Sequence, residues 1–196
     1  MSAQAAGTSP AEAPAHLSAR AYVSSLSHTQ RLVVLYGGAL LAIASFVRFG
    51  FSGHALVGAI FAPTLLLLSV IDLDRRLIPD AIVLPALGAV LVLQIAFHPG
   101  HTLEWVLASL GAALFLFIPL LIYPAGMGMG DVKLAALLGA ALGTSVTVAI
   151  AVALFAGGIV ALFVLGREGI EARKKAIPYG PFLALGGIVV FFLGGH

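Results

Sequence analysis

Cysteine is absent from the 196 residues, and charged side chains are scarce. Without cysteine the chain can form no disulfide, no thiol nucleophile and no cysteine-ligated zinc site. Asp, Glu, Lys and Arg together make up 9% of the residues, whereas 61% are hydrophobic. A soluble domain usually contains roughly 25% charged residues. The composition therefore excludes an ordinary soluble globule and predicts a surface that faces lipid.

The chain also lacks the marks of a highly charged partner or a signal peptide. Its formal net charge is only +2, and no basic patch is interleaved with aromatic residues, so nucleic acid is not expected as a partner. Residues 1–30 are rich in Ala, Ser and Pro and contain no apolar core. We expect them to form a mobile cytoplasmic tail with an interfacial turn near Leu17–Leu26. A single membrane domain is expected over residues 31–196.

Long apolar runs dominate the rest of the chain. A helix needs about 20 apolar residues to span a bilayer, with a practical range of about 17–25. Two of the seven apolar segments in this chain are shorter, namely the fifth, Val132–Leu142, and the seventh, Pro181–Leu193. The fifth can span the bilayer only if it begins below the headgroups or continues past Gly143. The expected fold is an all-α, polytopic bundle of about seven spanning helices: Leu32–Phe49, Ala55–Ile71, Ala81–Phe97, Leu103–Tyr123, Val132–Leu142, Ser145–Leu165 and Pro181–Leu193.

Loop charges indicate the orientation of this bundle. If the N-terminus is cytoplasmic, nine of the ten Lys and Arg residues fall in cytoplasmic segments and only Arg48 falls outside. The positive-inside rule predicts this asymmetry. Joining the fifth and sixth segments would move the basic run 167–175 outside, so we expect a turn at Gly143-Thr144 between them. The C-terminus is then expected outside.

Four aspartates fall at the cytoplasmic face in this topology: Asp72, Asp74, Asp80 and Asp131. Asp80 follows a proline and opens an apolar helix, so an N-cap role accounts for it. Asp74 lies beside two arginines and is expected to be a solvated loop charge. Asp72 ends an apolar run at the membrane boundary. A helix-end pairing with an arginine three or four residues later explains Asp72 about as well as a functional role does.

Asp131 follows a glycine-rich run, Gly126-Met127-Gly128-Met129-Gly130-Asp131-Val132-Lys133. The alternating glycines allow the backbone to approach another segment closely. The structural alternative for Asp131 is again an N-cap role, and its carboxylate takes the place where a helix N-terminus would bind phosphate. Lys133 follows the aspartate instead of closing a Gly-Lys-Ser/Thr sequence, which excludes a Walker loop.

Considered together, Asp72 and Asp131 indicate a shared site more strongly than either residue does alone. Two predicted helices separate them, so both return to the same face, and carboxylates at membrane depth are functional candidates. A close pair of carboxylates shares one proton, because both cannot ionise at a separation of a few Å. The ionised carboxylate can activate water, and the protonated one can donate to a carbonyl. The histidines lie in the tail, the outer loops or the C-terminus, so no Ser-His-Asp triad is available. No metal or other cofactor is expected.

Three motifs in order resemble those of the type IV prepilin peptidases, membrane aspartic peptidases of the Gly-x-Gly-Asp class. They are Asp72 with Leu77-Ile78-Pro79-Asp80, then Gly128-Met129-Gly130-Asp131-Val132-Lys133, then Ile177-Pro178-Tyr179-Gly180-Pro181-Phe182. The similarity covers roughly residues 55–196. It implies that Asp72 and Asp131 are the catalytic pair. It also implies that a second set of residues supports the site or binds substrate: Gly128, Gly130, Lys133, Pro178 and Gly180.

The resemblance implies a setting as well. We expect a multi-pass protein of the bacterial inner membrane, in contact with lipid. It would cleave the leader peptides of prepilin or pseudopilin substrates at the cytoplasmic face, in a type IV pilus or protein-secretion system. Larger members of this family add an N-terminal helix, a zinc domain with two Cys-x-x-Cys pairs, and N-methylation with S-adenosylmethionine. This chain is similar to the compact, peptidase-only members, so methylation is not expected.

Two other interpretations stay open at the level of sequence. A small ion- or proton-coupled transporter could use Asp72 and Asp131 to bind a cation or relay protons. Both residues are predicted at one face, however, whereas transport sites usually lie near the midplane. A non-catalytic membrane scaffold could keep the same fold. The sequence specifies no oligomeric state.

Overall fold

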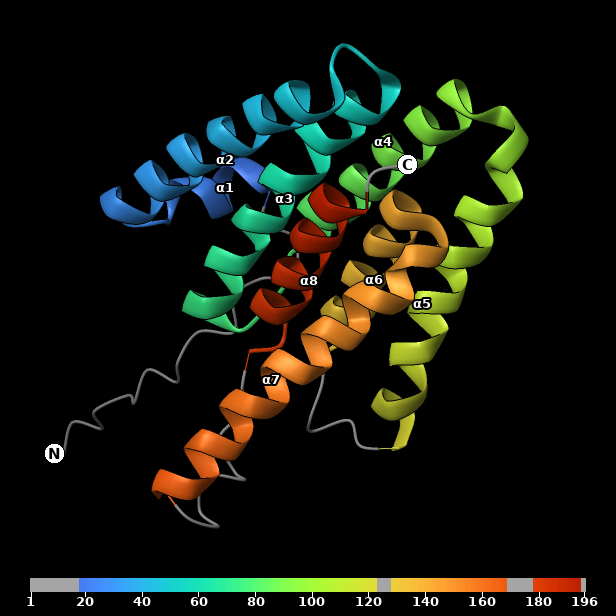
Figure 1. The fold of residues 1–196 in the computed structure, drawn as a ribbon. Coiled ribbons are helices and arrows are strands. Elements are labelled where there is room, and N and C mark those ends of the chain that lie inside the picture. The colour runs from blue at the N-terminus through green and yellow to red at the C-terminus, as the bar shows by residue number, and fades with distance from the viewer. Residues whose placement is uncertain (1–17, 123–127, 169–177, 195–196) are drawn as a thin grey trace, which may run out of the picture.

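The computed structural model describes residues 18–122, 128–168 and 178–194, and every regular element within these ranges is a helix (Figure 1). In chain order the elements are α1 (Ala19–Ser24), α2 (His28–Phe49), α3 (Gly53–Arg75), α4 (Asp80–Phe97), η1 (Pro99–His101), α5 (Thr102–Ile122), α6 (Met129–Leu142), η2 (Gly143–Ser145), α7 (Val146–Glu168) and α8 (Gly180–Leu193). Each of the seven predicted segments coincides with one of the helices α2 to α8. The expected all-α fold is therefore confirmed.

Five helical stretches of the described chain are long and apolar enough to cross a membrane. They are His28–Phe49, Gly53–Arg75, Asp80–Phe97, Pro99–Ile122 and Met129–Val164. α8 is also apolar but has only 14 residues. The outer helices expose large apolar side chains, such as Val47 on α2, which is 81% exposed. Lipid tolerates such a surface, which in water would favour association.

A sharp turn divides the stretch Met129–Val164 into α6 and α7. Gly143 follows α6 with a φ of +55°, and η2 leads into α7. A β-carbon on residue 143 would lie 2.7 Å from the ring of Trp105, so the position requires glycine for space as well as for backbone conformation. The predicted turn at Gly143-Thr144 is confirmed.

Contacts between distant segments set the directions of the helices. The side-chain amide of Gln94 on α4 donates to the carbonyl of Ala141 near the end of α6, at 3.1 Å. At the other end of the same two helices, Lys133 meets Asp80. α4 and α6 are therefore parallel, and successive helices alternate in direction. The C-terminus of α3 and the N-termini of α4, α6 and α8 lie at one end of the bundle (Figure 1).

α6 occupies the middle of the bundle and is almost completely buried. Every residue from Leu137 to Leu142 is buried. α5 crosses α6 so closely that a β-carbon on Gly139 would lie 2.4 Å from the carbonyl oxygen of Ala108. The Ser109 hydroxyl donates to the carbonyl of Ala136 at 2.9 Å across the same crossing. Small residues and interhelical hydrogen bonds are the usual means of helix association in lipid, where the hydrophobic effect does not drive helices together.

The N-terminal segment is helical where the structure describes it. α1 takes the place of the interfacial turn expected near Leu17–Leu26, and its Tyr22 is buried against Ile71 of α3. α2 begins at His28 behind a capping box, a few residues before the predicted start of the first spanning segment. Residues 1–17, which form most of the expected tail, lie outside the described residues.

Candidate active site

Asp72 lies in the last turn of α3. The helix ends there because Arg76 takes a left-handed backbone conformation, with a φ of 54°, and its N–H bonds the carbonyl of Asp72 at 2.8 Å. The Asp72 carboxylate is buried and accepts a hydrogen bond from the backbone N–H of Gly180 at 3.0 Å. Arg76 attracts this carboxylate electrostatically. Its hydrogen-bond partner, however, belongs to α8 and not to the helix-end arginines considered from the sequence.

Asp131 lies in the first turn of α6. The N-cap residue of this helix is Gly128, and Oδ2 of Asp131 accepts a hydrogen bond from the Gly128 N–H at 3.1 Å. The carboxylate is buried. Asp131 is therefore not the N-cap itself. It is the third helical residue (N3), and its side chain accepts a hydrogen bond from the backbone N–H of the N-cap residue, as in a capping box.

The two carboxylates lie on neighbouring helices, at the end of the bundle where α3, α6 and α8 pack together. The negative charge of Asp72 acts directly on Asp131. Each carboxylate accepts one backbone amide hydrogen bond, from Gly180 and Gly128 respectively. Two negative charges at short range in a buried site repel each other, so such a pair is suited to holding a single proton.

At two of the predicted supporting glycines, any larger side chain would clash with a neighbouring segment. A β-carbon on Gly180 would lie 2.7 Å from Oδ2 of Asp72, and one on Gly130 would lie 2.7 Å from the β-carbon of Ile78. The backbone of α8 can therefore reach the Asp72 carboxylate only because residue 180 has no side chain. Gly130 likewise lets α6 pack directly on the segment that joins α3 and α4.

The remaining motif residues of the predicted set differ from this pattern. A β-carbon on Gly128 would meet nothing closer than 3.8 Å, so close approach is not the reason for glycine there. Pro178 is half-buried and immediately precedes Tyr179, the N-cap residue of α8. Gly126 and Met127, which complete the glycine-rich run, lie outside the described residues.

Lys133 forms an ion pair with Asp80 at the same end of the bundle. Its Nζ lies 2.6 Å from both carboxylate oxygens. The expected N-cap role of Asp80 is wrong, because Pro79 is the N-cap residue of α4 and Asp80 is the first helical residue. The prediction failed because the partner of Asp80 lies 53 residues away in the chain, and local sequence does not show it.

Asp74 has an ordinary structural role. It lies in the last turn of α3 and not in a loop, which corrects the expectation of a loop charge. It is exposed, and its carboxylate contacts Arg75 at 3.6 Å and Gln30 at 3.4 Å. Neither contact involves Asp72 or Asp131, so Asp74 serves as an internal control for the two buried carboxylates.

Tyr179 was missing from the predicted site residues, although the third motif contains it. Burial first, and then the negative charge of Asp131, raise the pKa of the Tyr179 phenol, so the phenol keeps its proton near neutral pH. Its ring packs against Phe182 and faces Gly157 of α7. Tyr179 is therefore a neutral phenol in the neighbourhood of Asp131.

The described part of the chain holds no group of three His, Cys, Asp or Glu side chains placed to bind a metal ion. The chemistry available to the site is thus acid–base chemistry by two carboxylates, with a phenol nearby. One carboxylate can take a proton from water while the other gives a proton to a carbonyl oxygen. Both lie at one end of the bundle, which differs from the midplane position usual for transport sites.

Comparison with known proteins adds to this picture of a membrane bundle with two adjoining buried carboxylates. Residues 59–165 match the Type IV leader peptidase family. The prepilin leader peptidase/N-methyltransferase of Burkholderia pseudomallei is 34% identical over 169 residues, which cover 83% of this chain and 54% of that protein. The protein of the same name from Pseudomonas putida is 36% identical over 179 residues, covering 84% and 61% respectively. The corresponding protein of Neisseria gonorrhoeae is 31% identical over 175 residues, covering 82% and 56%. No solved structure matches the chain.

These features define a multi-pass α-helical membrane protein with a paired-carboxylate site. The chain belongs to the Type IV leader peptidase family, since the match over residues 59–165 covers more than half of the chain. The chain spans a little more than half the length of the curated relatives it matches.

Proposed function

We propose that this protein is an aspartic endopeptidase that cleaves the leader peptide of prepilin-like substrates at the cytoplasmic face of the bacterial inner membrane. The main support is the buried pair of Asp72, held by the backbone amide of Gly180 on α8, and Asp131, held by the backbone amide of Gly128 at the start of its own helix. The names of the relatives include both a peptidase and an N-methyltransferase. The paired carboxylates support the peptidase reaction only.

The proposed reaction needs one ionised and one protonated carboxylate. The ionised group takes a proton from a water molecule as the water oxygen attacks the carbonyl carbon of the scissile bond. The protonated group gives its proton to the carbonyl oxygen, which produces a neutral tetrahedral intermediate. Collapse of this intermediate breaks the C–N bond. The proton taken from water passes to the leaving amine, and one hydroxyl of the intermediate returns a proton to the carboxylate that had protonated the carbonyl oxygen, which leaves a carboxylic acid product. Each carboxylate thereby ends in its starting protonation state, and water and the peptide are the only reactants consumed.

The orientation follows from the charge distribution. Among the described residues, six Lys and Arg residues lie toward the end of the bundle that carries the carboxylate pair, and only Arg48 lies toward the opposite end. This side is therefore proposed to be cytoplasmic. A leader peptide would approach from the cytoplasm, while the apolar helix that follows it in the substrate would stay in the bilayer beside the enzyme.

The test is cleavage of a co-expressed prepilin by single Asp variants, read as a mobility shift on a gel. Asp72→Asn and Asp131→Asn should each lower cleavage by at least about a hundredfold, because asparagine can neither take nor give the proton. The double variant should be little worse than either single variant, since the two groups act as a unit. Asp74→Asn is the matched control and should cleave normally. Substantial cleavage by Asp131→Asn would exclude this function and favour a transporter or a scaffold.

A further inference from the structure

A groove lies between α3 and α4, with α1 and the start of α2 at one end. Its volume is about 750 Å³. Its walls are apolar, with Ile60 on α3 and Pro85 and Ala89 on α4 among the lining residues. The hydroxyl of Thr64, which also lines the groove, donates to the carbonyl of Ile60 in its own helix at 2.7 Å. The walls therefore suit a hydrocarbon ligand.

The groove runs from the carboxylate end of the bundle toward its middle. Leu67 and Ala81 are the lining residues nearest that end, because α3 ends at Arg75 and α4 begins at Asp80. From Ala81 to Ala89, the deepest lining residue on α4, the helix rises about 12 Å at 1.5 Å per residue. The hydrocarbon core of a bilayer is about 30 Å thick, so each leaflet contributes about 15 Å. The depth of the groove thus matches one leaflet.

Two arginines, Arg20 of α1 and Arg31 of α2, line the same groove. The Arg31 side chain is held in place, because its Nε donates to the carbonyl of Leu26 at 3.0 Å and its Nη2 donates to the carbonyl of Ser24. A guanidinium has five N–H donors, of which these two bonds use two. Within the described part of the chain, neither arginine forms an ion pair, and the residues that line the groove include no acid.

The packing of α1 on α3 places these charges at the outer end of the groove. Tyr22 and Leu26 are buried in one cluster with Ile71, which lies in the last turns of α3. The Arg75 guanidinium lies 5.9 Å from the centre of the Tyr22 ring. Arg20 therefore stands at the level of the membrane surface, while the apolar walls extend from it toward the bilayer centre.

We propose that this groove binds an anionic phospholipid, with its phosphate at Arg20 and Arg31 and an acyl chain between α3 and α4. Guanidinium groups match phosphate oxygens with paired N–H donors. The apolar walls begin where the headgroup ends and accept a chain over the depth of one leaflet. This inference goes beyond the proposed function and holds whether or not the chain is a peptidase.

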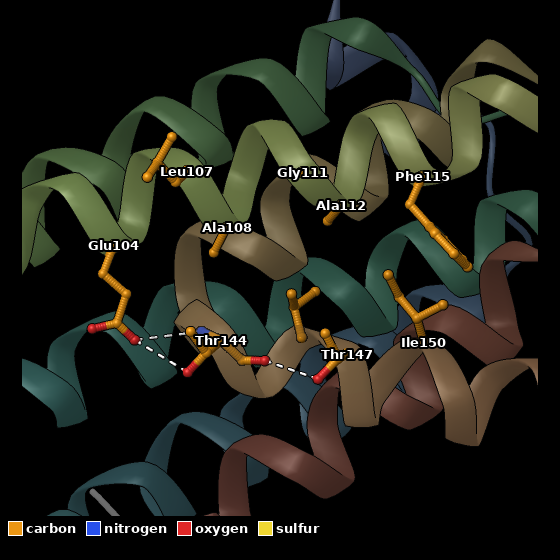
Figure 2. A pocket seen from close by; sticks show the side chains of 10 residues that line it. Glu104, Leu107, Ala108, Gly111, Ala112, Phe115, Thr144, Thr147 and Ile150 are labelled. Atoms are coloured by element: carbon orange, nitrogen blue, oxygen red, sulfur yellow. Dashed lines mark hydrogen bonds between the residues drawn. The ribbon is translucent and has the colours of Figure 1, made fainter.

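Charge and depth favour a lipid over other occupants. A free anion would use the two arginines but leave the apolar walls uncovered. A spanning helix of a partner needs about 30 Å of groove, whereas this groove offers about 12 Å. The groove between α5 and α7, shown in Figure 2, provides a contrast. It is also mostly apolar, but its charged group is the Glu104 carboxylate, which accepts a hydrogen bond from the Thr144 hydroxyl at 3.2 Å. An anionic headgroup would be repelled there.

The first test compares headgroups on the purified full chain in a neutral detergent, with bound lipid measured by native mass spectrometry. Dioleoylphosphatidylglycerol should bind about tenfold more tightly than dioleoylphosphatidylcholine, which has the same acyl chains but no net charge. Arg20→Gln should weaken binding of the anionic lipid by about fivefold and leave binding of the neutral lipid unchanged. Arg20 suits this test because its side chain is exposed and forms no hydrogen bond with other described residues.

The matched control is Arg167→Gln. It removes one positive charge at the same end of the bundle but outside the groove, and it should leave both affinities unchanged. Equal binding of the two lipids by the native chain would overturn the proposal. So would equal losses in Arg20→Gln and Arg167→Gln, since the lipid would then respond only to the overall charge of this face.

The second test fills the apolar part of the groove. Ale89 is replaced in Ala89→Phe, which should lower the affinity for both lipids by about tenfold, the scale on which an apolar pocket distinguishes ligands of different size. Gly111→Phe, which fills the groove between α5 and α7 instead, should leave both affinities unchanged. Thermal unfolding of both variants without lipid controls for folding, and the Arg20→Gln result decides the matter if Ala89→Phe does not fold.

Two further outcomes identify a different occupant. Glycerol phosphate, which has the charged headgroup but no acyl chain, should not displace the bound lipid. Displacement at equal concentration would show a site for a free phosphate ester and refute the lipid. A dimer of the native chain that is lost in Ala89→Phe, without any preference for the anionic lipid, would show that a second copy covers the groove. Neither readout depends on cleavage, so failure of the peptidase function and failure of the lipid site are separate results.

Discussion

Gly180 provides the most direct test of how α8 positions Asp72, one of the two carboxylates that we propose to be catalytic. In the native chain its N–H donates to Oδ2 of Asp72 at 3.0 Å, and a β-carbon on residue 180 would lie 2.7 Å from the same oxygen. Ordinary van der Waals contact begins at 3.4 Å. In Gly180→Ala the carboxylate must therefore retreat by roughly 0.7 Å or turn away from the amide, and misplacement of a catalytic group by about 1 Å can cost a hundredfold in rate.

We expect Gly180→Ala to lower cleavage of prepilin by about tenfold to a hundredfold, with most of the loss in kcat because the damaged group acts on the reacting bond. The contrasting variant is Gly128→Ala. Its β-carbon meets only ordinary contacts, and loss of a glycine N-cap costs less than about 1 kcal/mol of helix stability. Its rate should stay within a few-fold of the native rate.

The assay is the rate of leader removal from a purified prepilin in proteoliposomes, with both variants adjusted to equal enzyme content. Thermal unfolding in detergent controls for stability, since a carboxylate that shifts by a fraction of an ångström need not unfold the bundle. A native rate for Gly180→Ala would refute the positioning of Asp72 by α8. So would an equal loss in Gly180→Ala and Gly128→Ala.

Three further predictions concern the Lys133–Asp80 ion pair, the orientation of the chain in the membrane and the role of metal ions in cleavage. The Lys133–Asp80 pair is partly exposed, so Lys133→Met and Asp80→Asn should each lower the free energy of unfolding by no more than about 1 kcal/mol. In a double-mutant cycle, the double variant should lose no more than the larger of the two single effects. Additive losses would mean that the two residues do not interact. Phe51→Cys, fully exposed in the turn between α2 and α3, should be labelled by an impermeant reagent from the periplasmic side, while Arg167→Cys should be labelled only from the cytoplasm; the reverse pattern would invert the topology. Chelating agents should leave cleavage unchanged, because the paired carboxylates need no metal to activate water; activity lost in a chelator and restored by a divalent ion would contradict a purely aspartic mechanism.

The helices were predictable from the sequence because apolar run length is a local signal. The break between α6 and α7 was predictable from charge alone, since a fused helix would have carried the run 167–175 to the wrong side. The structure places the turn at Gly143, as that argument required. A simple measure of length and hydropathy does not detect the break and treats Met129–Val164 as one stretch.

The site was only partly predictable, and the limit is sequence separation. The alternation of helices predicts that Asp72 and Asp131 return to one face, but local chemistry explained Asp72 equally well as a helix-end charge. The contact that fixes this carboxylate comes from Gly180, 108 residues later. The partner of Asp80 lies 53 residues away. No periodicity or capping rule encodes such pairs, which arise only when α3, α4, α6 and α8 pack together.

Tyr179 shows a different limit. The residue lies within a motif that the sequence analysis singled out, but neighbouring Pro178 and Gly180 drew attention because proline and glycine have obvious backbone roles. A tyrosine in an apolar segment is usually explained by packing. Only the packing of its ring against Gly157 of α7 and its proximity to Asp131 distinguish it from an ordinary packing residue.

The unequal lengths of α7 and α8 have a consequence for the proposed cleavage of a peptide bond that adjoins an apolar helix. α7 packs on Tyr179 at Gly157 and then continues to Glu168, about 16 Å further at 1.5 Å per residue. α8 begins only after Tyr179. Backbone amides that leave a helix cannot be left unpaired in lipid and are tolerated only beside protein or water. A bond inside a helix is also sheltered from attack, because its carbonyl is already hydrogen-bonded. For the proposed function, the part of α7 beyond Gly157 supplies a protein surface next to Tyr179, the kind of surrounding in which an unpaired substrate backbone is tolerated at membrane depth.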